Sequence, residues 1–147
     1  MKRKILSNAG NKIVVGLLSL MCVAQIPFIS AMAGNSVLKD YTFDFNSSDW
    51  QTTREEWKDD TSASFMHCET SDEPWDAYTA WVWGSSTYDG IESEQSEPYS
   101  FSVGVTKHMT NWVRENDMDM AYIKARLSEG GDDGKGYFTG VWSPDSV

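Results

Sequence analysis

The chain has 147 residues, of which 40% are hydrophobic and 13% aromatic, enough for one folded domain and too apolar for a disordered polymer. Its 12 Lys and Arg residues stand against 22 Asp and Glu residues, which gives a formal charge of -10. A nucleic acid is therefore not expected as a partner, because an acidic surface repels its phosphates.

The opening segment, residues 1–33, is predicted to be an export signal. Basic residues at positions 2–4 precede a long uncharged run that a proline interrupts, and Ala31 and Ala33 satisfy the small-residue rule for cleavage. A retained membrane anchor is the alternative, because the uncharged run is long enough to span a bilayer. We expect cleavage after Ala33, which releases residues 34–147 as a secreted, extracellular domain with no stable membrane insertion.

Cleavage would leave an acidic and aromatic domain. Residues 1–33 hold four of the 12 basic residues and no acid, so their loss changes the formal charge from -10 to -14. All 7 Trp and all 6 Tyr residues follow the cleavage point. So many rings in one small domain indicate a core built on aromatic side chains, a face of exposed rings that binds a partner, or both.

Short strands are predicted for the first half of the domain, since apolar side chains recur there with a period of two. Residues 41–45 and 62–68 show this alternation, whereas residues 50–57 mix tryptophan with polar residues and fit a strand or a loop. Cys68 is the only cysteine after the cleavage point and is expected to be a buried, inert thiol. The alternative is an intermolecular disulfide, so the protein is predicted to be a monomer or a Cys68-linked dimer.

The run at residues 77–83 has the strongest β propensity in the chain. Its alternation places Tyr78 and Val82 on one face and Trp81 and Trp83 on the other. A strand with apolar residues on both faces is either central in its sheet or borders a binding surface.

The second half of the domain continues the pattern with one interruption. Residues 99–105 alternate again, whereas residues 107–116 fit a short helical turn or a crossover. Residues 121–127 are predicted to form a half-buried strand, and residues 137–142 to return as its hairpin partner after a glycine-rich loop. Short strands without a long amphipathic helix predict an all-β fold, a small antiparallel β-sandwich or open barrel.

Four short segments share a pattern with known proteins. They are residues 140–146 (Gly-Val-Trp-Ser-Pro-Asp-Ser), 125–127 (Ala-Arg-Leu), 111–115 (Asn-Trp-Val-Arg-Glu) and 58–62 (Lys-Asp-Asp-Thr-Ser). Together they resemble a group of small secreted proteins of Gram-positive bacteria, mostly of unknown function, some of whose relatives are encoded beside bacteriocin-type export systems. The resemblance implies secretion and a compact β domain, and it carries over no catalytic residue.

The C-terminal ending supports two interpretations. Trp142 can end a strand by burying its ring while Pro144 sets the geometry of a turn, which is a purely structural role. The functional alternative is an exposed tail, in which Asp145 and its serine neighbours act as a recognition tag.

The inventory of reactive residues argues against an enzyme. Cys68 lacks a base, because its neighbour His67 would project to the opposite face of a strand. Acidic pairs such as Glu55 and Glu56 are compatible with a glycosidase, but in so acidic a chain they are more typical of a solvated face. We predict a noncatalytic protein with no cofactor.

Metal binding is expected to be weak at most. Asp117, Asp119 and the acids at residues 132–133 offer hard oxygens suited to calcium. Neither segment matches a helical calcium loop, and diffuse binding of cations by net charge is the favoured interpretation.

Two binding functions remain. The first is a secreted, noncatalytic surface-recognition protein, with a bacteriocin-like effector in interbacterial or host-facing interaction as the leading case and an unknown extracellular protein or glycan as the partner. The second is a carbohydrate-binding module, because exposed tryptophan rings stack on sugars. The basic pair Lys124 and Arg126 could contact anionic groups, although on an edge strand such residues more often prevent aggregation. The candidate binding residues are Trp81, Trp83, Trp112, Trp142 and Asp145.

Overall fold

The structure is a computed structural model that describes residues 36–46, 49–72, 76–128 and 134–146. The predicted export signal at residues 1–33 lies outside these ranges. Within them, no helix has the length and hydropathy needed to cross a membrane.

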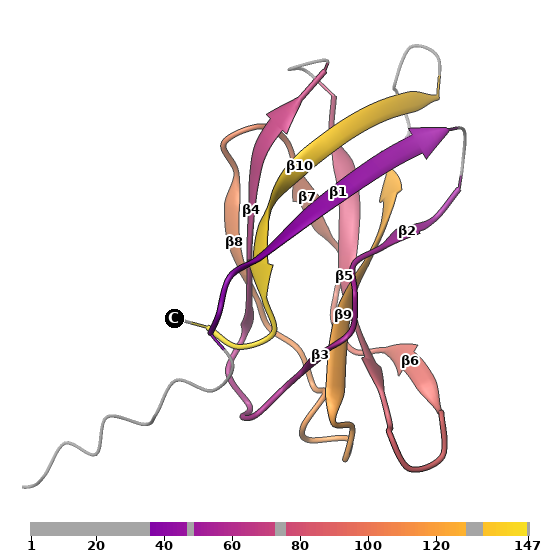
Figure 1. Cartoon of the computed structure of the whole chain (residues 1–147), viewed down its shortest axis with the longest axis vertical. Coiled ribbons are helices and arrows are strands. Elements are labelled where there is room, and N and C mark those ends of the chain that lie inside the picture. The colour runs from indigo at the N-terminus through magenta and orange to yellow at the C-terminus, as the bar shows by residue number, and fades with distance from the viewer. Residues whose placement is uncertain (1–35, 47–48, 73–75, 129–133, 147) are drawn as a thin grey trace, which may run out of the picture.

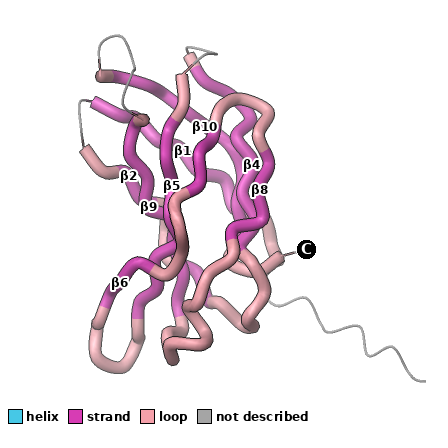
Figure 2. The backbone as a smooth tube through the Cα atoms, turned by 180° about the vertical axis from the view of Figure 1, so that it is seen from behind, coloured by secondary structure: helices cyan, strands magenta, loops and turns pink. Residues whose placement is uncertain are grey.

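Two antiparallel sheets pack face to face and make up the described domain (Figure 1). Sheet A contains, in order of neighbouring strands, β1 (Lys39–Asn46), β10 (Lys135–Ser143), β4 (Ser64–Ser71) and β8 (Thr106–Met109). Sheet B contains β2 (Gln51–Thr52), β9 (Met120–Leu127), β5 (Tyr78–Ser85) and β6 (Glu92–Glu94), while β3 (Glu56–Trp57) also pairs with β9 and β7 (Tyr99–Phe101) with β5. Strands and loops account for the whole described backbone (Figure 2). The prediction of an all-β sandwich is confirmed.

The core lies between the two sheets and is built on aromatic rings. In β1 the predicted alternation buries Tyr41, Phe43 and Phe45, and sheet B contributes Tyr78 from the opposite side. The rings of Phe43 and Tyr78 meet edge to face with their centroids 5.5 Å apart, an arrangement that aromatic quadrupoles favour. Period-two patterning therefore produces the core directly.

Two topological expectations are wrong. The segments at residues 121–127 and 137–142 do not form a hairpin, because β9 lies in sheet B and β10 in sheet A. Strand β9 is not an edge strand either, since β5 pairs with one side of it and β2 and β3 with the other. Its outward cations consequently do not protect a sheet edge.

The structure assigns the two segments for which the sequence allowed more than one interpretation. Residues 50–57 contain the two short strands β2 and β3, which follow β9 along one side. Residues 107–116 form most of β8 and then a turn that crosses from sheet A to sheet B, so the crossover interpretation is confirmed.

Candidate functional site

The outer face of sheet B carries a cluster of tryptophans and cations. Strand β5 directs Trp81 and Trp83 outward, and β9 directs Lys124 and Arg126 to the same side, with Trp81 paired opposite Lys124. Trp50 completes the cluster from the segment that leads into β2. We call these five residues the tryptophan–cation face.

The five side chains interleave rings with positive charges. Lys124 Nζ lies 3.9 Å from the ring centroid of Trp83 and 5.1 Å from that of Trp50. The guanidinium carbon of Arg126 lies 5.5 Å from the Trp50 centroid and 5.6 Å from the Trp81 centroid. The rings of Trp50 and Trp81 are themselves 5.2 Å apart. All four cation–ring distances fall within the ~6 Å range in which a ring attracts a cation.

Neither Lys124 nor Arg126 forms an ion pair with a carboxylate of the described residues. Among the described residues, ion pairs join Lys39 to Glu56, Lys58 to Asp145 and Arg114 to Asp119, and none reaches the tryptophan–cation face. In a chain with almost twice as many acids as bases, this is an unusual arrangement. Tryptophan rings hold the two cations in place, and no carboxylate of the described residues neutralises their charges.

The predicted pair of tryptophans shares a face, but it does not form an open platform. Trp81 is only 9% exposed, because Trp50 and the side chain of Arg126 lie against it. Trp83 is half-buried beneath Lys124. Trp50 is 44% exposed and therefore presents the most accessible ring of the face. Sequence reasoning missed Trp50, since residues 50–57 could not be assigned to a strand and the direction of its ring was unknown.

The two ends of this sheet differ in charge. Directly opposite Trp83 on β9, the hydroxyl of Tyr122 donates a hydrogen bond of 3.0 Å to the Glu92 carboxylate. Burial, helped by that carboxylate, raises the pKa of the Tyr122 hydroxyl above its ordinary value. The indole N–H of Trp83 is buried and has no hydrogen-bond acceptor among the described residues. Trp83 therefore lies where the two ends meet, between Tyr122 and Glu94 in register and beneath Lys124.

Trp112 lies elsewhere. It is 44% exposed in the turn that follows β8, and its backbone N–H donates to the Gln95 carbonyl at 2.9 Å. No ring contact within the described ranges joins Trp112 to the tryptophan–cation face.

The remaining two candidates, Trp142 and Asp145, are interior residues. Trp142 is 1% exposed and belongs to the aromatic core, and Asp145 has no exposed surface. The alternative of an exposed acidic tail is therefore wrong for Asp145, and neither side chain lies on the tryptophan–cation face. The structural interpretation of the C-terminal ending is confirmed for the Trp142 ring.

Asp145 is buried because it pairs with Lys58. Lys58 Nζ donates to Asp145 Oδ1 at 2.7 Å, to the Ser62 carbonyl at 2.6 Å and to the Pro144 carbonyl at 2.8 Å. These bonds use all three ammonium donors. Asp145 Oδ2 accepts the backbone N–H of Asp59 at 3.0 Å. We call this cluster the C-terminal latch, which joins two of the four segments that carry the family resemblance, residues 58–62 and 140–146.

Cys68 also lies in the core, as expected. Its thiol has no exposed surface, and burial raises its pKa. The nearby hydroxyls of Tyr41 and Tyr78 are hydrogen-bonded to each other at 2.7 Å. His67 points to the other side of β4, where its Nδ1 lies 2.8 Å from Thr106 Oγ1. A bridge to a second chain would require the sandwich to open, and a monomer is therefore the simpler prediction.

No metal centre is formed by the described residues, in which three or more suitable side chains nowhere come together. Asp119 instead accepts hydrogen bonds from Thr87 and Arg114, which hold its pKa below the ordinary value. The acids at residues 132–133, named as possible calcium ligands, lie outside the described ranges.

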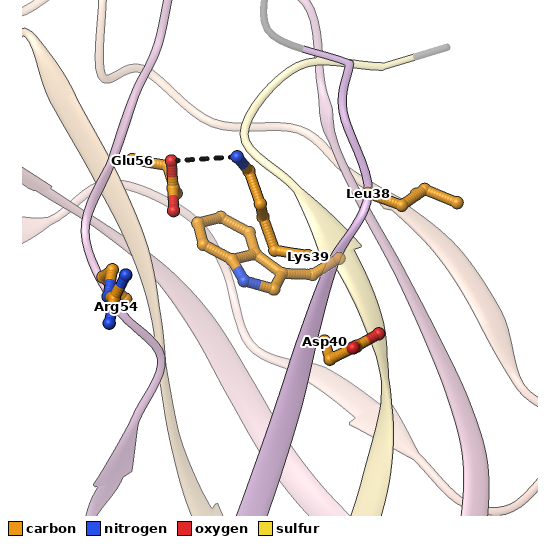
Figure 3. Close-up of a pocket in the computed structure, with 6 residues that line it drawn as sticks. Leu38, Lys39, Asp40, Arg54 and Glu56 are labelled. Carbon is orange, nitrogen blue, oxygen red and sulfur yellow. Dashed lines mark ion pairs between the residues drawn. The ribbon is translucent and has the colours of Figure 1, made fainter.

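A shallow pocket of about 530 Å³ lies where the start of β1 meets the β2–β3 segment (Figure 3). The ion pair between Lys39 and Glu56, 3.4 Å long, spans its wall. Arg54 and Asp40 add one more charge of each sign, so the pocket is electrically balanced. The lining residues are Leu38, Lys39, Asp40, Arg54, Glu56 and Trp142. This balance distinguishes the pocket from the tryptophan–cation face, whose charges are all positive.

A family profile described as "Protein of unknown function (DUF2712)" matches residues 29–146. No curated protein and no solved structure matches the chain.

Proposed function

The chain belongs to the DUF2712 family, and we propose that it is a secreted, noncatalytic recognition protein, a bacteriocin-like effector in contacts between bacteria or with a host. The observation that carries this proposal is the tryptophan–cation face. Side chains on the solvent-facing side of an antiparallel sheet are ordinarily polar and need no contacts with one another. Here that side holds Trp81, Trp83 and two cations that have no ion pair among the described residues, and the ring of Trp50 lies against them.

Exposed rings beside cations are typical of recognition surfaces. Tryptophan and arginine are the residues most enriched among the contacts that dominate binding energy. The rest of the domain is acidic, so the two cations distinguish this face from the others. A negatively charged partner would be attracted to this face first. Both properties support a binding role for the outer face of sheet B.

A noncatalytic role agrees with the placement of the reactive groups. A nucleophilic thiol needs access to substrate and a base that activates it. Cys68 is buried with a raised pKa, and the ring of His67 lies on the other side of β4. The secretion part of the proposal is supported by the export-signal pattern of residues 1–33.

A carbohydrate-binding module is the second candidate. Trp50 is 44% exposed and Trp57, in the neighbouring strand β3, is 55% exposed. Accessible indole rings can stack on the apolar face of a sugar. This candidate is restricted to a glycan target, whereas the partner of the first is an unknown extracellular protein or glycan.

Secretion and binding can be tested on one preparation. The full-length gene is expressed in a Gram-positive host, and mass spectrometry of the medium should find a product that begins near residue 34. The purified product is then labelled and incubated with bacterial and animal cells. We expect saturable binding to at least one cell type. An intact chain that remains in the membrane fraction, or binding to no cell type, would refute the proposal.

Substitution identifies the face that is responsible. The double variant Lys124→Gln, Arg126→Gln should lose cell binding. Lys107→Gln is the matched control, because Lys107 is an exposed cation on β8 of sheet A. Equal loss in the control would mean that overall charge, and not the tryptophan–cation face, governs binding. A glycan array with the same protein separates the two candidate targets.

A further inference from the structure

We propose that Lys124 and Arg126 form a subsite for the carboxylates of an acidic glycan, with the exposed ring of Trp50 stacking on a sugar beside them. This inference rests on the proposed function, since it names the chemistry that the same face would recognise.

The first step concerns charge. Both cations are held on rings, and no ion pair among the described residues reaches either of them. Two cations without an ion pair call for a ligand that brings acceptors and negative charge, and a carboxylate supplies both.

The second step concerns size. Lys124 and Arg126 are two residues apart in a strand, so their backbone positions are separated by roughly 7 Å. That distance is on the scale of one sugar ring. Trp50 contacts both cations and is the accessible ring between them. A pyranose stacked on Trp50 would therefore place its substituents within reach of either charge.

The third step decides between a glycan and a protein partner. A stable protein interface buries roughly 800 Å² on each partner and is centred on apolar anchors. The cations cover much of Trp81 and Trp83, which leaves Trp50 as the accessible ring of this face. One ring flanked by two charged groups suits a narrow, polar and acidic chain better than a broad apolar patch.

The fourth step concerns charge density. The domain after cleavage has a formal charge of -14, derived from the loss of four basic residues from a chain of charge -10. A polymer with a phosphate on every unit would be repelled at long range. A glycan in which neutral sugars separate the carboxylated ones reduces this repulsion while still filling the subsite. The geometry therefore favours a sparsely carboxylated glycan.

The test uses the protein secreted from the full-length gene. Its tryptophan fluorescence is titrated with a hyaluronan hexasaccharide, in which carboxylated and neutral sugars alternate, with a polygalacturonate hexasaccharide, and with chitohexaose as the neutral match. The hyaluronan hexasaccharide should change the fluorescence saturably, bind more weakly as salt is raised and bind more tightly than polygalacturonate, whereas chitohexaose should not bind. Absence of hyaluronan binding, or tighter binding of polygalacturonate, overturns the inference.

Variants separate binding from structural support. Lys124→Gln with Arg126→Gln should weaken binding by about tenfold or more, because both charged contacts are lost. The charge-conserving pair Lys124→Arg, Arg126→Lys should retain most of the affinity, and Lys107→Gln should match the wild type. Thermal melting is measured on every variant. A double Gln variant that binds normally overturns the inference, whatever its melting temperature.

Two further arms test the class of ligand. Tripolyphosphate and a hexaglutamate peptide are titrated in the same way. If one of them bound more tightly than either carboxylated sugar, the target would be a phosphate or a protein and not the inferred glycan. The cell-binding experiment shows whether the proposed function survives. Cell binding that depends on Lys124 and Arg126 without any binding of carboxylated sugars overturns only the ligand inference.

Discussion

Two lysines of this domain illustrate how neighbours decide the role of a charge. In the C-terminal latch, Lys58 is buried and directs its ammonium at three oxygen acceptors. On the tryptophan–cation face, Lys124 lies over tryptophan rings and has no carboxylate within ion-pair distance among the described residues. All three ammonium donors of Lys58 are therefore used within the domain, and none is available to a ligand. Lys124 is held in place by the rings, and its charge remains available to a ligand.

The same comparison applies to the tryptophans. Trp142 fills the core with 1% of its surface exposed, whereas 44% of Trp50 is exposed. Both residues have an aromatic side chain of the same size, and only their surroundings differ. Stability should therefore depend on the latch and the core, and binding on the tryptophan–cation face. The following predictions test this division, beginning with the largest effect.

Breaking the latch should cost the most. Lys58→Met leaves the Asp145 carboxylate buried without its cation, and we expect a loss of about 3–5 kcal/mol in the free energy of unfolding. Urea unfolding followed by fluorescence measures it. The double variant Lys58→Met, Asp145→Leu should recover much of the loss, because no unpaired charge remains. A single variant as stable as the wild type would show that the buried pair contributes nothing.

Truncating the core tryptophan should have a comparable or slightly smaller effect. Trp142→Ala opens a cavity in the core and should cost about 3–5 kcal/mol, with some of that loss recovered if the surroundings collapse. Trp50→Ala is the matched control and should cost about 1 kcal/mol or less, because its ring contributes mainly cation–π contacts at the surface. Similar losses in both variants would contradict the division between core and face.

Alkaline pH should weaken the core. Burial raises the pKa of Cys68 above its ordinary value of 9.0, and those of Tyr41 and Tyr78 above 10.0. Above about pH 9 the unfolded chain loses protons that the folded chain keeps, so the free energy of unfolding should fall as pH rises, by at most roughly 1.4 kcal/mol per pH unit for each such group. Urea unfolding at pH 7, 9 and 10 measures the decline. Cys68→Ala should reduce its early part, and a flat profile would contradict the buried placement of these groups.

Neutralising the face should cost less stability than breaking the latch or truncating Trp142. The double variant Lys124→Gln, Arg126→Gln loses four cation–ring contacts of surface type and should destabilise the domain by about 1–2 kcal/mol in total. Thermal melting detects the change. A loss as large as that of Lys58→Met would make the tryptophan–cation face a structural support first and a binding surface second.

The local patterns of the chain were reliable where a strand buries one face. Alternation at residues 41–45 predicted the buried rings of β1, and alternation at residues 77–83 placed Trp81 and Trp83 together on one side of β5. Which strands pair with each other was harder to predict from the sequence. The expected hairpin between residues 121–127 and 137–142 failed because adjacent strands in the chain can join different sheets.

Four of the five residues of the tryptophan–cation face were named from the sequence, Trp81 and Trp83 as binding candidates and Lys124 with Arg126 as a basic pair. The facing of Trp81 and Trp83 follows from period two, which is a local property of any strand. Trp50 was missed because it lies beside a strand of only two residues, too short to show a period. Asp145 was placed among the binding candidates because nothing near it in the chain reveals Lys58, which is 87 positions away and buries it.

The amino-acid sequence by itself determined the all-β class, the aromatic core and the acidic character of the domain, because each depends on composition or on alternation between neighbours. Tertiary structure alone decided which charges are satisfied and which remain available. A lysine finds its acceptors or its rings only when distant strands pack side by side, and that packing separates the closed C-terminal latch from the open tryptophan–cation face.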